Sequence, residues 1–236
     1  MQSEDRVIHF SVELIHAATG LRKDALQQLY FDLSRTKAAY DNTDFSNPVQ
    51  ARFHSRRGQR AQSVCLFLPD RLLIVEEWAD MPLSTFCERV EEVGERALVA
   101  RGQPRYLVHA ATVRSTLALT HHEDARQFLL DHVCQQAGRI QPYFQRPVAQ
   151  GGLRFALPET EDQPGNLNVI IESYRHSRRE VYVEVKGLFQ QHPVAPGQMG
   201  TVVAHVRAVR DFIAERVQPY LAQYDHGGDA PPPDAG

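Results

Sequence analysis

The tetrapeptide His-Ser-Arg-Arg occurs twice in the chain, at residues 54–57 and 176–179. Both copies are predicted to lie between extended segments, where two basic hairpin loops could grip a phosphate group through paired guanidinium hydrogen bonds. The candidate phosphate-binding residues are Arg56, Arg57, Arg178 and Arg179. The alternative is that both copies are solvated turns. A net charge of −3 and a pI of about 6.4 make nucleic acid an unfavoured partner.

A pair of neighbouring carboxylates offers a second kind of chemistry. Glu76 and Glu77 close a strongly apolar segment and are followed by Trp78. Paired carboxylates can serve as general acid and base, as in glycoside hydrolases. In an alternating strand, however, Glu76 and Trp78 share one face and Glu77 takes the other, which favours a solvated strand end with Trp78 packed beneath a helix. A hydrolase would combine this pair with His109 or His176 in a pocket between the two halves of the chain.

The sequence assigns no metal site and no cofactor. His121 and His122 are adjacent, and adjacent side chains on a helix point about 100° apart, so the two cannot bind one ion from a regular helix. The glycine-containing segment 196–201 lacks the Lys-Ser/Thr pair of a phosphate-binding P-loop. No residue is therefore assigned a catalytic role.

Hydrophobic periodicity gives the elements that must position these side chains. Extended segments are predicted at 7–15, 49–55, 62–68, 71–78, 105–119, 152–157, 167–175 and 180–187. Amphipathic helices are predicted over 22–40, from residue 82, from residue 121 and over 200–224, the second and third opening with capping boxes. Pro219 is expected to kink or interrupt the last helix.

Each half of this pattern reads β-α-β-β-β-α, which indicates a duplicated α+β unit; the alternative is a chance recurrence of common elements. The predicted fold is two tandem units, ferredoxin-like or related, forming antiparallel sheet with helices covering one face. The halves are residues 1–103 and 104–225, and they could share one sheet or form two. The tail, 226–236, is rich in Gly, Pro and Asp and is predicted to be disordered.

The order of elements, the helix that ends each half and the strand-like segment Gly-Gly-Leu-Arg-Phe-Ala-Leu at 151–157 resemble a sporadically distributed family of uncharacterised bacterial α+β proteins. The resemblance spans most of residues 6–224. It implies a duplicated α+β fold. It implies no activity and no site residue.

Composition bounds the location and the function class. Cys65, Cys87 and Cys134 are odd in number and lie in apolar segments, as expected of reduced packing cysteines. The polar start of the chain does not resemble a secretory signal, and no stretch is long and apolar enough for a membrane span, so a cytoplasmic location is expected. With no catalytic signature and exposed strand edges expected, the favoured function is a non-enzymatic binding or assembly module that self-associates or binds another protein.

Overall fold

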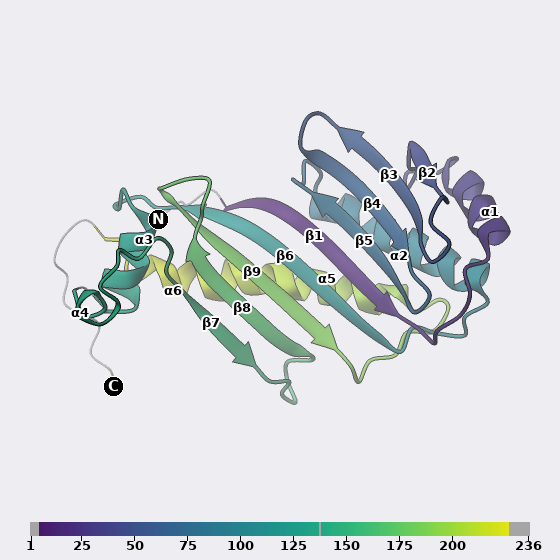
Figure 1. Cartoon of the computed structure of the whole chain (residues 1–236). Helices are drawn as coiled ribbons and strands as arrows, with labels where there is room; N and C mark the ends of the chain where they lie inside the picture. Colours follow the sequence, from purple (N-terminus) through teal and green to yellow (C-terminus); the bar gives the residue numbers. More distant parts are fainter. Residues whose placement is uncertain (1–4, 137, 227–236) are drawn as a thin grey trace.

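The computed structural model describes residues 5–136 and 138–226, and the strands within these residues form one antiparallel sheet of nine (Figure 1). The strands are β1 (Asp5–Ile15), β2 (Asn42–Asp44), β3 (Ala51–Arg57), β4 (Ala61–Phe67), β5 (Arg71–Glu77), β6 (Val108–Ala118), β7 (Gly152–Leu157), β8 (Asn166–Ser173) and β9 (Glu180–Phe189). Their order across the sheet is β2-β3-β4-β5-β1-β6-β9-β8-β7. The two halves of the chain therefore share one sheet, and they meet where β1 pairs with β6.

The helices are α1 (Lys23–Leu33), α2 (Leu83–Arg101), α3 (Ala125–Gln127), α4 (Gln141–Phe144), α5 (Met199–Phe212) and α6 (Gln218–Ala222), with π-helical turns η1 (Phe128–Val133) after α3 and η2 (Ile213–Val217) between α5 and α6. The two long helices, α2 and α5, pack against each other. α2 contacts β1 and β5, and α5 contacts β6 and β9. In Figure 1 both helices lie behind the sheet. We call the side of the sheet that they contact the helix side and the opposite side the open side.

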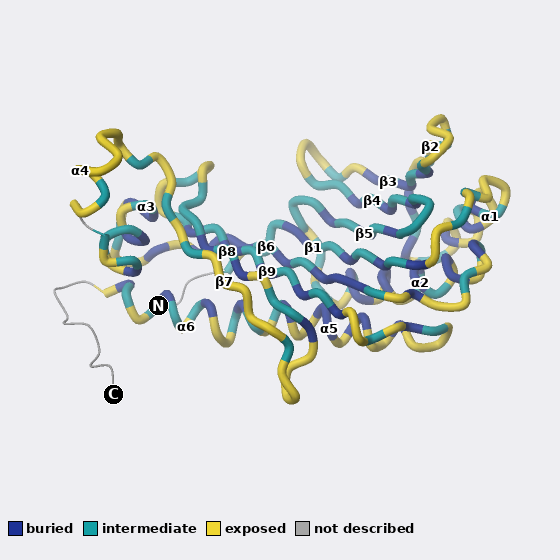
Figure 2. Tube along the Cα trace, turned by 60° about the horizontal axis from the view of Figure 1, so that its bottom comes forward, coloured by how far each residue is buried: buried dark blue, intermediate teal, exposed yellow. Residues whose placement is uncertain are grey.

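Strand alternation separates the two sides. Along β1, Phe10, Val12 and Leu14 are buried on the helix side, whereas Ser11 and Glu13 between them are only half-buried on the open side. The same alternation follows along β5 and β9, because successive side chains of a strand point to opposite faces. Figure 2 shows this alternation as buried and half-buried positions that follow each other along the central strands. The core is thus one layer that continues through both halves.

One helix end and one helix start differ from the sequence prediction. The first helix was expected over 22–40 but ends at Leu33, after which the chain turns. The helix expected from residue 121 begins at Ala125 instead, because Asp124 is its N-cap and accepts hydrogen bonds from the amides of Arg126 and Gln127. The Thr120 amide donates to the Asp225 carboxylate at 2.9 Å, so the capping box predicted for this helix is wrong. The capping box predicted for the second helix is wrong too, because the N-cap of α2 is Pro82 and no side chain caps it.

The last helix, predicted over 200–224, continues through α5, η2 and α6. Pro219 supplies no amide, and the π-helical turn that precedes it redirects the hydrogen bonds that a proline would break, so the helix is not ended there. The predicted disordered tail, 226–236, lies outside the described residues except for His226. Within those residues, no helix is long and apolar enough to cross a lipid bilayer.

Candidate binding groove

A row of polar side chains crosses the open side of the sheet where the two halves meet. Glu77 of β5 lies opposite His9 of β1, His9 lies opposite Arg114 of β6, and Arg114 lies opposite Glu184 of β9. These residues are neighbours because cross-strand partners on one face stand within about 5 Å of each other. The row therefore brings two residues from each half into one line.

Hydrogen bonds join the row in pairs. His9 Nδ1 lies 3.1 Å from Glu77 Oε1, and this contact lowers the pKa of the Glu77 carboxyl. Arg114 Nε donates to Glu184 Oε2 at 2.6 Å, and the Tyr182 hydroxyl donates to the same oxygen at 2.9 Å. Burial, followed by the nearby Glu184 charge, raises the pKa of Tyr182, so its hydroxyl stays a donor at neutral pH. These hydrogen bonds hold the side chains in position on both sides of the β1/β6 pair, which we call the seam.

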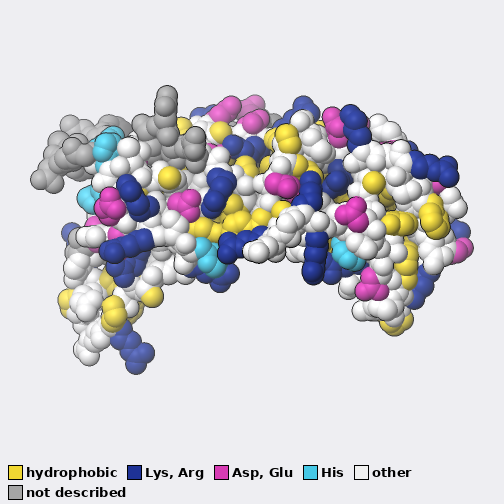
Figure 3. All heavy atoms as spheres, turned by 90° about the horizontal axis from the view of Figure 1, so that it is seen from above, with side chains coloured by type: hydrophobic (Ala, Val, Ile, Leu, Met, Phe, Trp, Pro, Cys, Tyr) yellow, Lys and Arg dark blue, Asp and Glu magenta, His cyan; other side chains and the backbone are white. Residues whose placement is uncertain are grey.

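Two adjoining hollows lie at the end of the sheet that carries this polar row. The first has a volume of about 490 Å³ and is lined by Ile8, His9, Glu77, Trp78, Arg114, Gln150, Glu172, Ser173, Tyr174, Arg175, His176 and Tyr182. The second, of about 500 Å³, is lined by Asp124, Arg126, Ala149, Gln150, Ser173, Tyr174, Arg175, Ser177 and Arg178. Because several residues line both, we treat them as one groove. Figure 3, which looks onto the end of the molecule that is uppermost in Figure 1, shows one side hollowed, with Lys and Arg side chains along it.

Aromatic rings and an arginine gather where the hollows adjoin. Tyr174 and Arg175 line both hollows, and Tyr182 and His176 line the first. The Tyr174 and Tyr182 rings stack with centroids 6.3 Å apart and planes 11° apart. The His176 ring meets the Tyr174 ring edge-on, with centroids 5.3 Å apart. Arg175 Nε donates a hydrogen bond to His176 Nε2 at 3.1 Å. Flat apolar faces thus stand beside an exposed guanidinium, a combination typical of surfaces that bind other molecules.

Trp78 occupies a strained position in the groove. Its φ is +50°, in the left-handed region that a bulky side chain rarely adopts. The guanidinium carbon of Arg60 lies 5.1 Å from the centre of its ring. The sequence prediction that Trp78 shares a face with Glu76 beneath a helix is wrong, because the strand ends at Glu77 and the positive φ turns Trp78 into the groove beside Glu77. Such strain concentrates at functional sites.

The second hollow has a cationic rim around one carboxylate. Asp124 accepts from Arg126 Nη2 at 3.1 Å and from Arg178 Nε at 3.3 Å. Burial opposes ionisation of Asp124, but hydrogen bonds from the Gln127 and Arg126 amides and the two guanidinium groups lower its pKa overall. Arg126 also donates to the Val148 carbonyl at 2.9 Å, which ties the segment before β7 to the groove.

The four arginines proposed as phosphate ligands do not form one site. Arg178 lines the second hollow, and Arg179 pairs with Glu123 at 3.3 Å. The first tetrapeptide lies inside β3 and not between strands, so its two arginines point to opposite sides of the sheet. Arg56 is exposed on the open side, opposite Gln62, whereas Arg57 turns to the helix side.

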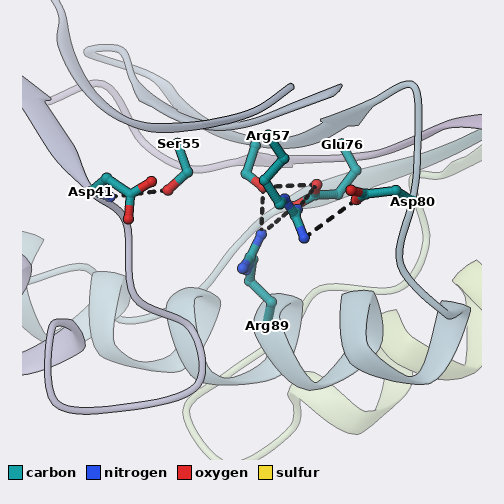
Figure 4. Close-up of polar contacts among 7 residues, drawn as sticks. Asp41, Ser55, Arg57, Glu76, Asp80 and Arg89 are labelled. Carbon is teal, nitrogen blue, oxygen red and sulfur yellow. Dashed lines mark hydrogen bonds and ion pairs between the residues drawn. The ribbon is translucent and has the colours of Figure 1, made fainter. Parts of the chain in front are cut away.

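Arg57 belongs to a buried charged cluster centred on Glu76 (Figure 4). Glu76 is 1% exposed, and its carboxylate receives hydrogen bonds from Arg57 at 2.8 Å, from the Ser63 hydroxyl at 2.8 Å and from Arg89 of α2. Arg57 also pairs with Asp80 at 3.3 Å. Burial raises the pKa of Glu76, and the two guanidinium groups and Ser63 act against that rise. The cluster joins β3, β4, β5 and α2, and its position indicates a structural role.

The residues of the hydrolase hypothesis are divided between the two sides of the sheet. Glu77 and His176 line the groove. Glu76 and His109 face the helix side, where His109 is fully buried and its Nε2 lies 2.7 Å from His205 Nδ1. Among the described residues, no three His, Cys, Asp or Glu side chains come close enough to hold a metal ion.

Sequence reasoning missed the groove residues His9, Arg114, Tyr174 and Tyr182. Alternation along 7–15 and 180–187 did place His9 and Tyr182 on the less apolar face of their strands. That signal finds a face but not a neighbour, because the strand order decides which strands bring their polar faces together.

Comparison of the chain with protein-family models and with curated proteins finds no match. The chemistry of the groove is therefore the guide to function.

Proposed function

We propose that this protein is a non-enzymatic binding module that holds an extended segment of another protein in the groove. The observation that carries the proposal is the strained Trp78, which stands in one hollow with His9 and Arg114 at the seam of the two halves. A tryptophan kept at positive φ costs stability, and its contribution to a binding surface accounts for that cost.

The type of partner follows from the side chains of the groove. Trp, Tyr and Arg dominate the binding energy of protein interfaces, and Trp78, Tyr174, Tyr182 and Arg175 all line the first hollow. Arg114 and Arg175 share this hollow with the carboxylates Glu77 and Glu172, as in surfaces that match the mixed charges of another protein. A groove for nucleic acid would be more uniformly basic. We therefore favour a peptide segment that carries a carboxylate for Arg175 and an aromatic or proline ring for the tyrosines.

The proposal includes the origin of the groove. Outward from the β1/β6 pair, both halves follow the same order of strands, β5-β4-β3 in one and β9-β8-β7 in the other. This order supports a duplicated β-α-β-β-β-α unit, ferredoxin-like or related, whose helices cover one side and leave the other side for binding. A cytoplasmic location is also proposed, supported by Cys65, Cys87 and Cys134, which are all unpaired thiols.

Selection of peptides tests the proposal without a known partner. A displayed library of random peptides is selected against the full chain, and the enriched peptides are titrated while the fluorescence of Trp78, the only tryptophan, is recorded. We expect peptides that share an acidic residue beside an aromatic residue or proline, and a change in Trp78 emission on binding.

Two charge-reversed variants give the control. Arg175→Glu should weaken binding of the selected peptides by at least about tenfold, the loss expected for one interface cation. Arg35→Glu, at an exposed arginine just after α1, should leave the affinity unchanged. Equal affinities of both variants would contradict the groove as the binding site. A single-stranded oligonucleotide that bound more tightly than the peptides, with steep salt dependence, would replace the protein partner by nucleic acid.

A further inference from the structure

The sheet ends in an unprotected edge at β7. Among the described strands, β7 pairs only with β8, and Figure 1 shows it at the margin of the sheet. Natural edge strands are commonly blunted by proline, lysine or a bulge. Between Gly152 and Leu157 the only charged residue is Arg154, and there is no proline. The backbone of β7 therefore offers a row of hydrogen-bonding groups to another strand.

The helix side of β7 is also less covered than that of its counterpart in the first half. In β3, the helix-side residues Ala51 and Phe53 are fully buried, with α1 packed against the strand. In β7, Phe155 and Leu157 continue the buried layer of β8 outward, yet each is 38% exposed. The ring of Tyr220 in α6 meets the Phe155 ring edge-on, with the ring centroids 6.5 Å apart. An apolar strip thus accompanies the open backbone edge.

The hydrogen-bond ladder shows which amides of β7 point outward. The Ser173 amide donates to the Gly151 carbonyl at 3.2 Å, so Gly151 and Ser173 are a hydrogen-bonded pair of the β7/β8 ladder. Hydrogen-bonded and non-hydrogen-bonded pairs alternate along an antiparallel ladder. The backbone groups of Arg154 and Ala156 therefore point away from β8, toward the open edge.

We propose that β7 pairs antiparallel with β7 of a second copy of this chain, about a twofold axis through Phe155. In this register Phe155 faces its own copy, Leu153 faces Leu157, and Arg154 faces Ala156. The amides and carbonyls of Arg154 and Ala156 then complete hydrogen-bonded pairs across the axis, and the apolar side chains meet on the helix side.

Charge selects this register over its neighbour. A twofold axis through Arg154 would place two guanidinium groups directly opposite each other on the open side, and like charges in that position are destabilising. The axis through Phe155 moves the two Arg154 side chains to diagonal positions. A second copy fits this edge because a strand paired antiparallel with itself is self-complementary, and the resulting contact closes on two chains.

Cysteine cross-linking tests the pairing and its register. In a Cys134→Ser background, Phe155→Cys places two thiols across a non-hydrogen-bonded pair, with Cα atoms about 4.5 Å apart, within the range of a disulfide. Oxidation with diamide should convert most of this variant to a covalent dimer. Arg154→Cys is the matched control, since diagonal Cα atoms stand about 7–8 Å apart, beyond the usual reach of a disulfide.

Sedimentation measures the same interface without cross-linking. The unmodified chain should show a dimer whose population rises with concentration. Ala156→Pro removes an amide that points away from β8, so it should retain the circular dichroism of the parent and dimerise at least about tenfold more weakly. A chain that stays monomeric at all concentrations, together with a Phe155→Cys variant that does not cross-link, would overturn the proposal. Equal cross-linking through positions 154 and 155 would overturn it as well, because a twofold axis at Phe155 forbids it.

Discussion

Glu76 and Glu77 are adjacent in β5, and their carboxylates lie on opposite sides of the sheet. Glu77 meets His9 in the groove, where its side chain is 35% exposed, whereas Glu76 is buried among Arg57, Ser63 and Arg89. Two carboxylates that act on one glycosidic bond must face the same substrate. The pleat of the strand prevents this, so the pair divides into one residue in the buried cluster and one that lines the groove.

This division predicts very different costs for the same substitution at the two positions. Glu76→Gln leaves the guanidinium groups of Arg57 and Arg89 without their buried counter-charge and should lower the free energy of unfolding by about 3–5 kcal/mol. Glu77→Gln removes a partly exposed contact to His9 and should cost no more than about 1 kcal/mol. Urea denaturation followed by circular dichroism measures both. Similar losses in the two variants would contradict the assignment of Glu76 to the fold.

The same contrast is expected within the first His-Ser-Arg-Arg segment. Arg57→Ala removes hydrogen bonds to Glu76 and Ser63 and the ion pair with Asp80, and should destabilise the protein by about 1–3 kcal/mol. Arg56 is exposed on the open side, and Arg56→Ala should change stability by less than about 0.5 kcal/mol. Phosphate binding lost in the Arg56 variant at unchanged stability would instead support the ligand role first considered for this residue.

Trp78 allows the backbone strain of the groove to be measured. At φ of +50°, alanine is disfavoured relative to glycine, so Trp78→Gly should be more stable than Trp78→Ala by about 1 kcal/mol. Both variants lose the ring and its contact with Arg60, so their difference isolates the backbone. Thermal unfolding followed by circular dichroism gives the comparison. A more stable alanine variant would show that residue 78 is free to relax from the left-handed region.

The sequence was sufficient for the α+β class and for most strands, because alternation in segments such as 7–15 and 180–187 is a local property. It was not sufficient for the groove. His9, Arg114 and Tyr182 come together through the order β1-β6-β9, which depends on long-range pairing. Trp78 was assigned to the wrong side because alternation holds only while the strand continues. The predicted helix start at residue 121 was wrong because other carboxylates accept hydrogen bonds from the backbone amides there. Asp124 caps the helix instead, and the distant Asp225 accepts from the Thr120 amide.

The buried histidines of the helix side predict acid-sensitive stability. Burial and the neighbouring His205 and His192 lower the pKa of His109 to about 3, and burial followed by His192 lowers that of His205 to about 4. His192 itself lies 3.1 Å from Glu159. Below the ordinary histidine pKa of about 6.5, the unfolded chain binds protons at His109 and His205 that the folded protein excludes. The contribution of these two histidines to stability should therefore be fully present above this pH. It should be lost as the pH decreases from about 6.5 toward 4.

The slope of that fall identifies the two residues. Each excluded proton contributes up to about 1.4 kcal/mol per pH unit, so the pair sets a loss of up to about 2.8 kcal/mol per unit near pH 5. In His109→Leu/His205→Leu the stacked packing on Phe189 changes stability at neutral pH, but the slope should become shallower because neither position can be protonated in the unfolded chain. His121→Leu, at an exposed histidine, is the matched control for replacing a histidine by leucine. Urea denaturation at a series of pH values measures all three. An unchanged slope in the double variant would mean that His109 and His205 are protonated equally in the folded and unfolded states, which their burial beside Phe189 opposes.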